Sequence, residues 1–269
     1  MTFARLLQRA ACLIMLIAPW HALFASENAE ALAKKLANPL ESLISVPFQL
    51  NYDGNIGPDE HGKRWTLNIQ PVVPFSINED WNLVSRTILP LIDQHDVVPN
   101  AGTQSGIGDI TQSFFLAPVK PATNGWQWGA GAVMLLPTGA DDFSSEKWGI
   151  GPTAAMIKQQ GAWTIGGLFN HVWSFAGNND RPDISATFLQ PFITHVSSNA
   201  VTTGIQTEAT YDWKSNQWSV PILAFMSKII IIGNQKVSLG GGIRYWATSP
   251  DNGPHDWGGK ISVTLLLPK

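Results

Sequence analysis

Cysteine and charge are both scarce in this sequence, and each shortage excludes a class of protein. The one cysteine among 269 residues is Cys12, near the start of the chain, so no disulfide and no cysteine metal site is expected after it. Charged residues make up 14% of the chain and form no basic patch, which argues against nucleic acid as a partner. Beyond residue 25, no apolar run is long enough for a membrane-spanning helix.

Catalytic and cofactor motifs are also missing. The sequence has no GxSxG elbow, no HExxH helix, no phosphate-binding loop and no EF-hand loop. The later histidines fall in expected loops or at strand ends, and none forms a metal-ligand pair by spacing: His61, His95, His171, His195 and His255. Ser174 beside His171 is the best remaining pair for an outer-membrane hydrolase. We therefore expect no enzyme activity, no cofactor and no metal.

The first 25 residues have the layout of a secretory signal peptide. Arg5 and Arg9 precede the apolar run Ala10–Ile17, and small residues follow at Ala22 and Ala25. We predict Sec-type export with cleavage near Ala25, which removes two arginines and takes the formal net charge from −3 to −5. The alternative is a retained N-terminal anchor helix, for which the apolar run is too short.

The stretch Arg64–Pro90 predicts a hairpin of two strands, each about ten residues long. Apolar side chains such as Trp65 and Leu67 alternate with polar ones, which is the period of a strand with one apolar face. A short polar turn, Ile77–Asp80, leads to the returning strand, which begins at Trp81. Tilted strands of this length span a bilayer, and indoles settle at its two interfaces. The hairpin therefore predicts part of an outer-membrane barrel.

Residues 44–269 carry this pattern throughout and predict an all-β, transmembrane, antiparallel up-and-down β-barrel. Twelve strands are expected, an even number, as a barrel with both chain ends in the periplasm requires. Their expected ranges are 44–52, 64–75, 81–90, 106–118, 126–137, 148–158, 163–173, 184–195, 200–211, 217–226, 237–246 and 257–267.

The connections between these strands alternate in length, as in bacterial barrels with long external loops and short periplasmic turns. Two connections fit poorly: Asp212–Asn216 is short for an external loop, and Ser227–Lys236 is long for a turn. Tryptophans gather at the expected strand ends and predict two aromatic girdles.

Four prolines lie inside expected strands, where each removes a hydrogen bond of the ladder. We expect bulges or strand ends at these positions: Pro71, Pro152, Pro191 and Pro221.

Residues 26–43 form the only convincing helical segment after the signal peptide. Ser26 can cap a short helix in which Ala29, Leu32 and Leu36 share one face. The helix can lie at the periplasmic mouth or enter the lumen as a plug, and the sequence leaves both alternatives open.

Charged side chains at the middle of a membrane strand must face the lumen, because exposure to lipid costs about 2–4 kcal/mol. This rule points Arg86 inward, and Gln70 lies opposite it across the periplasmic turn. Pairing the strands about the centre of the loop Leu91–Ser105 brings Arg86 level with Asp109, so we predict an ion pair between them.

A second set of inward polar side chains is expected on the last strands. Gln206 and Glu208 lie on the ninth strand, Arg244 on the eleventh and Lys260 on the twelfth, with Glu208 and Arg244 at similar heights. They predict either a charged constriction that selects solutes or a structural network that fills a narrow lumen.

Several strings resemble a family of proteobacterial outer-membrane proteins catalogued as "putative phenol-degradation meta-pathway proteins" and labelled "transporter". The resemblance covers essentially the whole chain after the signal peptide, and its last three residues, Leu267, Pro268 and Lys269, replace the common terminal Phe of barrels. The strings are Asn38–Asp53, Asn68–Pro90, Gly106–Ile110, Leu135–Asp142, Lys147–Pro152, Val172–Asn178 and Leu189–His195.

The resemblance implies a membrane barrel that takes up small, aromatic solutes. We expect an outer-membrane channel or transporter for passive passage of a small aromatic or hydrophobic solute, which could leave sideways at a prolyl bulge. Its partners would be outer-membrane lipid, the solute and the barrel-assembly machinery. The alternatives are a barrel enzyme acting on lipid and a closed structural or adhesive barrel.

Overall fold

The computed structural model describes residues 29–40 and 43–267. The predicted signal peptide, its cleavage near Ala25, the cap at Ser26 and the final Pro268 and Lys269 lie outside the described residues. One helix, α2 (Ala29–Leu36), precedes a single sheet of fifteen strand segments. None of the helical residues described here builds a helix long and apolar enough to cross a membrane.

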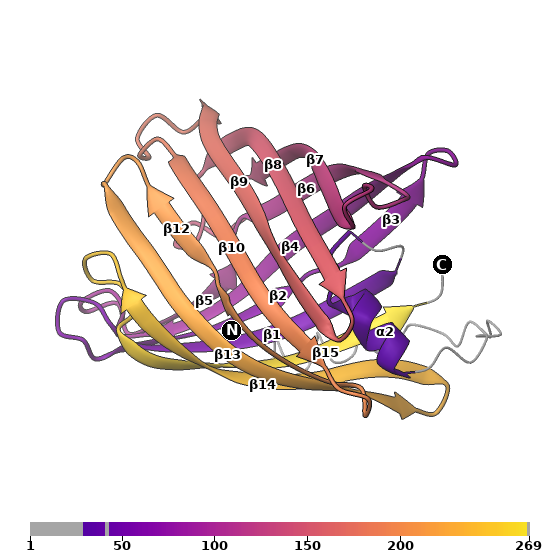
Figure 1. Cartoon of the computed structure of the whole chain (residues 1–269). Helices are drawn as coiled ribbons and strands as arrows, with labels where there is room; N and C mark the ends of the chain where they lie inside the picture. Colours follow the sequence, from indigo (N-terminus) through magenta and orange to yellow (C-terminus); the bar gives the residue numbers. More distant parts are fainter. Residues whose placement is uncertain (1–28, 41–42, 268–269) are drawn as a thin grey trace.

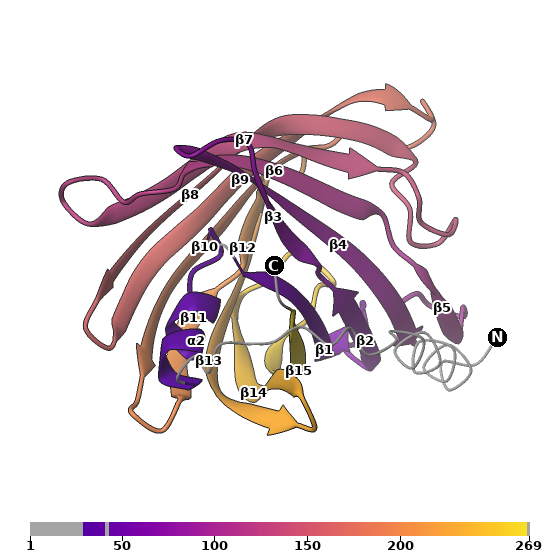
Figure 2. The same cartoon turned by 90° about the vertical axis from the view of Figure 1, so that its right-hand side faces the viewer.

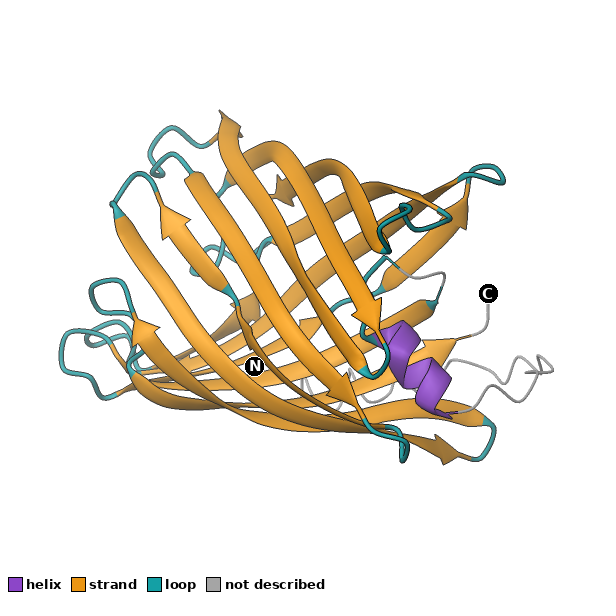
Figure 3. Ribbon diagram, viewed as in Figure 1, coloured by secondary structure: helices purple, strands orange, loops and turns teal. Residues whose placement is uncertain are grey.

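The fifteen segments form twelve antiparallel strands closed into a barrel (Figures 1 and 3). Three strands are interrupted once each, so that β2 and β3, β5 and β6, and β11 and β12 each form one strand of the barrel. The segments are β1 (Ile44–Ile56), β2 (Gly62–Ile69), β3 (Val72–Ser76), β4 (Trp81–His95), β5 (Thr103–Ile107), β6 (Ile110–Pro118), β7 (Trp126–Leu136), β8 (Lys147–Gln160), β9 (Trp163–Gly177), β10 (Ser185–Val196), β11 (Val201–Thr207), β12 (Ala209–Asp212), β13 (Gln217–Ile232), β14 (Gln235–Thr248) and β15 (Asp256–Leu267).

Closure comes from pairing between the first and last strands. Ile44 of β1 pairs with Leu267 of β15, and the register continues to Tyr52 opposite Gly259. Each neighbouring pair of strands is antiparallel, so the barrel has no free edge in the described chain. The predicted all-β, up-and-down barrel of twelve strands is confirmed.

The two ends of the barrel differ in the length of their connections. The turn end carries residues 77–80, 119–125, 161–162, 197–200 and 233–234, and the loop end carries residues 57–61, 96–102, 137–146, 178–184, 213–216 and 249–255. The long connection expected at Ser227–Lys236 is wrong, because β13 continues to Ile232 and turns at Gly233 and Asn234. The apolar run Ile229–Ile232 is therefore part of a strand.

The four prolines behave in two ways. Pro71 lies in the interruption between β2 and β3, and the register shifts between Val220 and Pro221, as predicted. The prediction is wrong for Pro152 and Pro191, which stay inside β8 and β10 and pair with Ala132 and Gly167. Pro152 has no paired residue on β9, and Pro191 has none on β11 or β12, because proline has no amide proton to donate to a second ladder.

Side chains alternate between the inside and the outside of the barrel. Outward positions of β13, β14 and β15 carry exposed apolar residues such as Met226, Ile243 and Ile261. Inward positions of the same strands carry Arg244 and Lys260, which are buried. A soluble protein would bury the first group and expose the second, so this arrangement indicates a barrel whose outer wall contacts lipid.

Aromatic side chains pair at both ends of the wall. Trp81 and Trp128 meet near the turn end with ring centroids 6.0 Å apart, and Tyr245 and Trp257 meet near the loop end at 5.1 Å. Trp246, which lies at the end of the expected strand 237–246, does not join the girdle, because its indole points inward and donates to Asp53 (Nε1 to Oδ1, 2.9 Å).

Replacing an outward apolar residue by arginine tests the lipid-facing wall. Ile243, which is 61% exposed in the middle of β14, would place an arginine in the hydrocarbon layer. Ile243→Arg should lower the free energy of unfolding by about 2–4 kcal/mol, measured by urea titration in lipid vesicles. The control Ile77→Arg, in a turn and 55% exposed, should cost about 0–1 kcal/mol. Equal losses would contradict a membrane-spanning wall.

Candidate functional site: the barrel interior

Helix α2 lies inside the turn end of the barrel (Figure 2). Its buried residues Leu32 and Ala33 pack against Val196, Ile229 and Leu266, which occupy inward positions at the ends of three strands. The side-chain amide of Gln159, on β8, also donates to the backbone oxygen of Lys34 (2.8 Å). All of these contacts are with residues at the turn-end termini of the strands, so the helix lies in the mouth of the barrel at that end.

The residues after α2 reach further into the barrel. Leu40 is 7% exposed and belongs to a cluster of inward side chains from β4, β6, β8 and β9. A Cβ atom on Gly129 would lie 2.9 Å from Cδ2 of Leu40, so this leucine packs closely over the glycine. The side-chain amide of Asn38 donates to that of Gln127, and Asn38 also caps the backbone nitrogen of Leu40 (3.0 Å).

One side of the interior is apolar. Its members come from neighbouring strands, are buried to 7% exposure or less, and surround Leu40. They are Val84, Phe115, Ala117, Ala155, Ile157 and Leu168, with Val72, Phe188 and Phe192 packed against them.

Another side, formed by β14, β15 and β1, is charged. Arg244 of β14 donates from Nη1 to both carboxylate oxygens of Asp53 on β1 (2.9 and 3.0 Å) and from Nη2 to Asn51 (2.6 Å). The two strands are separated by β15, so this contact runs through the enclosed space. The side chain of Arg244 is 6% exposed, and this paired geometry offsets the cost of burying its charge.

Glu208 joins charges from three strands. It lies between β11 and β12, and its Oε1 accepts from Lys260 Nζ (2.7 Å) and from the amide of Gln206 (2.8 Å). Its Oε2 is 3.8 Å from Arg244 Nη2, which agrees with the prediction that these two residues lie at similar heights in the barrel. Glu208 therefore links the ninth, eleventh and twelfth strands of the barrel.

Arg86 interacts with this network and not with Asp109, the partner predicted for it. Its guanidinium donates to Gln70 (Nη2 to Oε1, 3.1 Å) and interacts electrostatically with Glu208 across the barrel. The predicted Arg86–Asp109 ion pair is wrong, since Arg86 pairs with Ser113. The hairpin extends to His95 opposite Thr103, and the strand is interrupted at Gly108 and Asp109, so the register differs from the one assumed.

Asp109 instead fastens a loop at the loop end. Oδ1 accepts from the backbone nitrogen of Gly139 (3.0 Å) and from Ser144 Oγ (2.7 Å). Oδ2 accepts from the backbone nitrogen and the hydroxyl of Ser145 (2.7 and 2.6 Å). The same loop, residues 137–146, places Phe143 over Gly106, where a Cβ atom would come within 2.7 Å of its ring.

A neighbouring loop is tied to this one by charges. Glu146 accepts from Asn178 Nδ2 (2.6 Å) and from Arg181 Nε (2.8 Å), and both donors lie in the loop 178–184. These hydrogen bonds, with Asn178 first, hold the pKa of Glu146 below its ordinary value. Lys147 likewise lowers the pKa of Asp183 by a hydrogen bond at 3.2 Å. The two loops therefore form one connected rim.

The charged side chains described so far, together with Arg64, include more cations than carboxylates. Arg64, at an inward position of β2, is hydrogen-bonded to Gln94 (2.9 Å) and joins Arg86, Arg244 and Lys260, against two carboxylates, Asp53 and Glu208. The excess is two positive charges from these six residues, so the charged side favours anionic groups.

Sequence reasoning missed three parts of this interior: Asp53, Trp246 and Leu40. Asp53 falls just outside the expected strand 44–52, although it shares the parity of Gln49 and Asn51, so the alternation in the sequence could have indicated its inward direction. Leu40 had no such signal, because its partners lie on strands distant in the sequence.

Ser174 and His171, the best candidate pair for the alternative of a hydrolase, do not contact each other. Ser174 Oγ donates to Asp183 (3.2 Å) and accepts from the backbone nitrogen of Ile184 (3.0 Å), whereas His171 contacts Thr187 (2.7 Å).

Residues 53–252 match the model of a protein family described as "Putative MetA-pathway of phenol degradation". The chain belongs to this family. Among curated proteins, no match to the sequence is found.

The fold is similar to that of an outer membrane channel from Pseudomonas putida F1, with a TM-score of 0.66 and 12% identity over 84% of this chain and 96% of that one. It is also similar to outer membrane phospholipase A from Escherichia coli, with a TM-score of 0.52 and 9% identity over 89% and 98% of the two chains. Because a channel and an enzyme share the barrel, these likenesses identify the fold and leave function to the site.

Removing the carboxylate of Asp109 should release the loop 137–146. Asp109→Ala leaves four donors without their acceptor, so the rim loosens and single-channel current in planar bilayers should become larger or flicker more. The control is Asp142→Ala, which removes an exposed carboxylate from the same loop and should leave the current unchanged. Identical traces for both variants would show that the loop does not limit flow.

Proposed function

We propose that the protein is an outer-membrane channel for passive passage of a small solute with an apolar, aromatic body and an anionic or polar group. The observation that carries this proposal is the division of the interior. An apolar cluster around Leu40 occupies one side, and a charged network with a positive excess occupies another. A solute with both characters can contact both sides at once.

The proposed location is the outer membrane, with the turn end in the periplasm and the loop end outside. The exposed apolar outer wall and the aromatic residues near both ends support this placement. The family description supports an aromatic solute, because it refers to phenol degradation.

Passage requires movement of the segment that follows α2. Leu40 fills the apolar side, and it is held by Asn38 and by the close fit to Gly129. An apolar ring can replace Leu40 among the same side chains with little loss of buried area. The positive side can meanwhile hold a carboxylate or phenolate near Arg86.

A closed structural barrel is the second candidate, because α2 and Leu40 occupy the interior in this structure. It differs from the channel in one measurable property, the flux of solutes.

Liposome swelling with a panel of sugars, amino acids and phenolic compounds distinguishes the candidates. We expect benzoate to enter faster than a sugar or an amino acid of similar mass. Leu40→Ala, which leaves a gap in the apolar side, should speed entry several-fold, whereas Val98→Ala in an exposed loop should not. Absence of swelling with every solute, in both variants, would favour the closed barrel.

Removing one interior cation tests the positive side. Arg86→Ala should lower the anion preference measured as the reversal potential in a salt gradient across a planar bilayer. The control Lys158→Ala removes a cation that lies 5.9 Å from the Trp126 ring, at an outward position, and should leave the potential unchanged. An unchanged potential and current in Arg86→Ala would reduce Arg86 to a structural role.

A further inference from the structure

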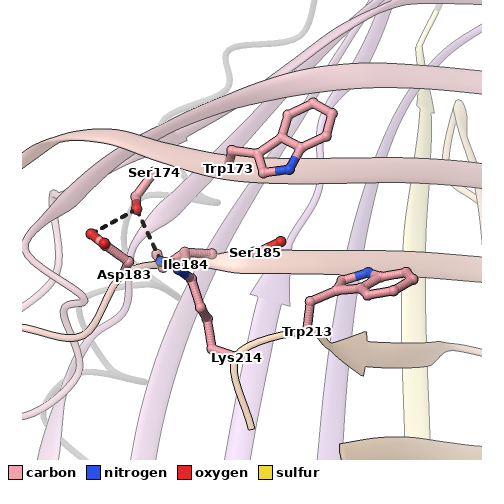
Figure 4. A pocket seen from close by; sticks show the side chains of 7 residues that line it. All are labelled: Trp173, Ser174, Asp183, Ile184, Ser185, Trp213 and Lys214. Atoms are coloured by element: carbon pink, nitrogen blue, oxygen red, sulfur yellow. Dashed lines mark hydrogen bonds between the residues drawn. The ribbon is translucent and has the colours of Figure 1, made fainter. Parts of the chain in front are cut away.

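A cavity of about 280 Å³ lies at the loop end, where β9 and β10 meet residues 213–216 (Figure 4). In this view Trp173 and Trp213 flank Ser185, while Ser174 and Asp183 lie on the other side of Ile184. The cavity is separate from the apolar cluster and the charged network of the interior, and it shares Asp183 with the rim.

Its aromatic residues face outward, toward the surroundings of the barrel. Ser185 pairs with Trp173 across β9 and β10, at outward positions of both strands. Trp173 and Trp213 are 50% and 54% exposed, respectively. Exposed indoles near the end of a membrane barrel fit the bilayer interface, and these two also border a cavity.

These indoles are held in place. Trp213 Nε1 donates to Thr187 Oγ1 (2.8 Å), and the His171 ring, which bonds the same hydroxyl, packs against Trp173 at a tilt of 48° with centroids 4.1 Å apart. Tyr211 packs edge-on against Trp213 at 4.8 Å. The walls are therefore ordered before any ligand arrives, which lowers the entropic cost of binding.

Charges around the cavity balance. Asp183 is bonded to Lys147 (3.2 Å) and also interacts with Lys214, which follows Asp212 in the neighbouring loop. Of the residues that line the cavity, Asp183 and Lys214 are charged, so one carboxylate and one ammonium group border it. The cavity thus offers hydroxyl, carboxylate and ammonium groups beside two apolar ring faces.

We propose that this cavity binds the sugar headgroup of a glycolipid in the surrounding membrane leaflet. A pyranose ring has an apolar C–H face that stacks on an indole, and hydroxyls that bond to Asp183, Ser185 and Lys214. Below the cavity, the outward pair Phe169 and Leu189 continues the lipid-facing wall, along which acyl chains can run. This inference rests on the proposed membrane location.

Hydrolysis of a lipid at the same place is less well supported. Ser185 Oγ is 3.5 Å from His171 Nε2, but no carboxylate in residues 29–40 and 43–267 contacts His171 to orient it as a base. Binding is therefore the inference, and hydrolysis is an outcome of its test.

Native mass spectrometry of the barrel, released from phosphatidylethanolamine nanodiscs with and without lipid A, tests the site. Trp173→Ala with Trp213→Ala should reduce lipid A retention at least tenfold. The control Trp257→Ala removes an indole that is 62% exposed near the same end and should change retention less than twofold. Heat-dependent gel mobility checks that each variant is folded.

Four results would overturn the inference. Retention could be unchanged in the double variant, or lost equally in the control. A free glucosamine disaccharide could bind as tightly as lipid A, which would assign a soluble saccharide. Fatty acid could be released by the parent protein and not by Ser185→Ala, which would assign an acyl hydrolase. Solute flux is measured separately, so its absence would contradict the proposed channel and leave the lipid result unaffected.

Discussion

The fold depends on one constraint: within lipid, every backbone N–H and C=O group must find its partner inside the protein. Antiparallel pairing between β1 and β15 meets it by removing the free edges of the sheet. Once the ladder closes, alternate side chains must face two different media. The small charged fraction follows, because only the inner half of each strand and the loops can hold charge at low cost.

The interior shows how such a barrel distributes its polar groups. Charges from β4, β11–β12, β14, β15 and β1 meet near Glu208 and Asp53, where each carboxylate has at least one cationic partner. Apolar side chains gather on the other strands and are covered by Leu40. Strand positions that are distant in the sequence thus form two surfaces that face each other across one lumen. A channel for a solute with both characters is consistent with this division.

The loop end is organised separately from the interior. Asp109 fastens one loop, and Glu146 and Asp183 tie it to the next, so that the mouth has an ordered rim. Asp183 also borders the outward cavity between Trp173 and Trp213. Lipid contact on the outside and loop order at the mouth therefore share a residue, and the two surfaces are physically connected.

By itself, the sequence determined the barrel, its twelve strands and the inward direction of Arg86, Arg244 and Lys260. Period-two alternation and turn residues are local properties, and lipid permits only one direction for a charge at mid-depth. Strand ends were less predictable, as at His95 and Ile232, because pairing with a neighbour extends a strand beyond its own pattern.

Only the tertiary structure decided which inward side chains meet. The partner of Arg86 depended on the interruption at Gly108 and Asp109, and the place of Leu40 depended on curvature that brings β4 and β9 together. Contacts across a closed barrel depend on the summed register of all intervening strands, and one bulge changes that sum. No local sequence pattern contains this quantity.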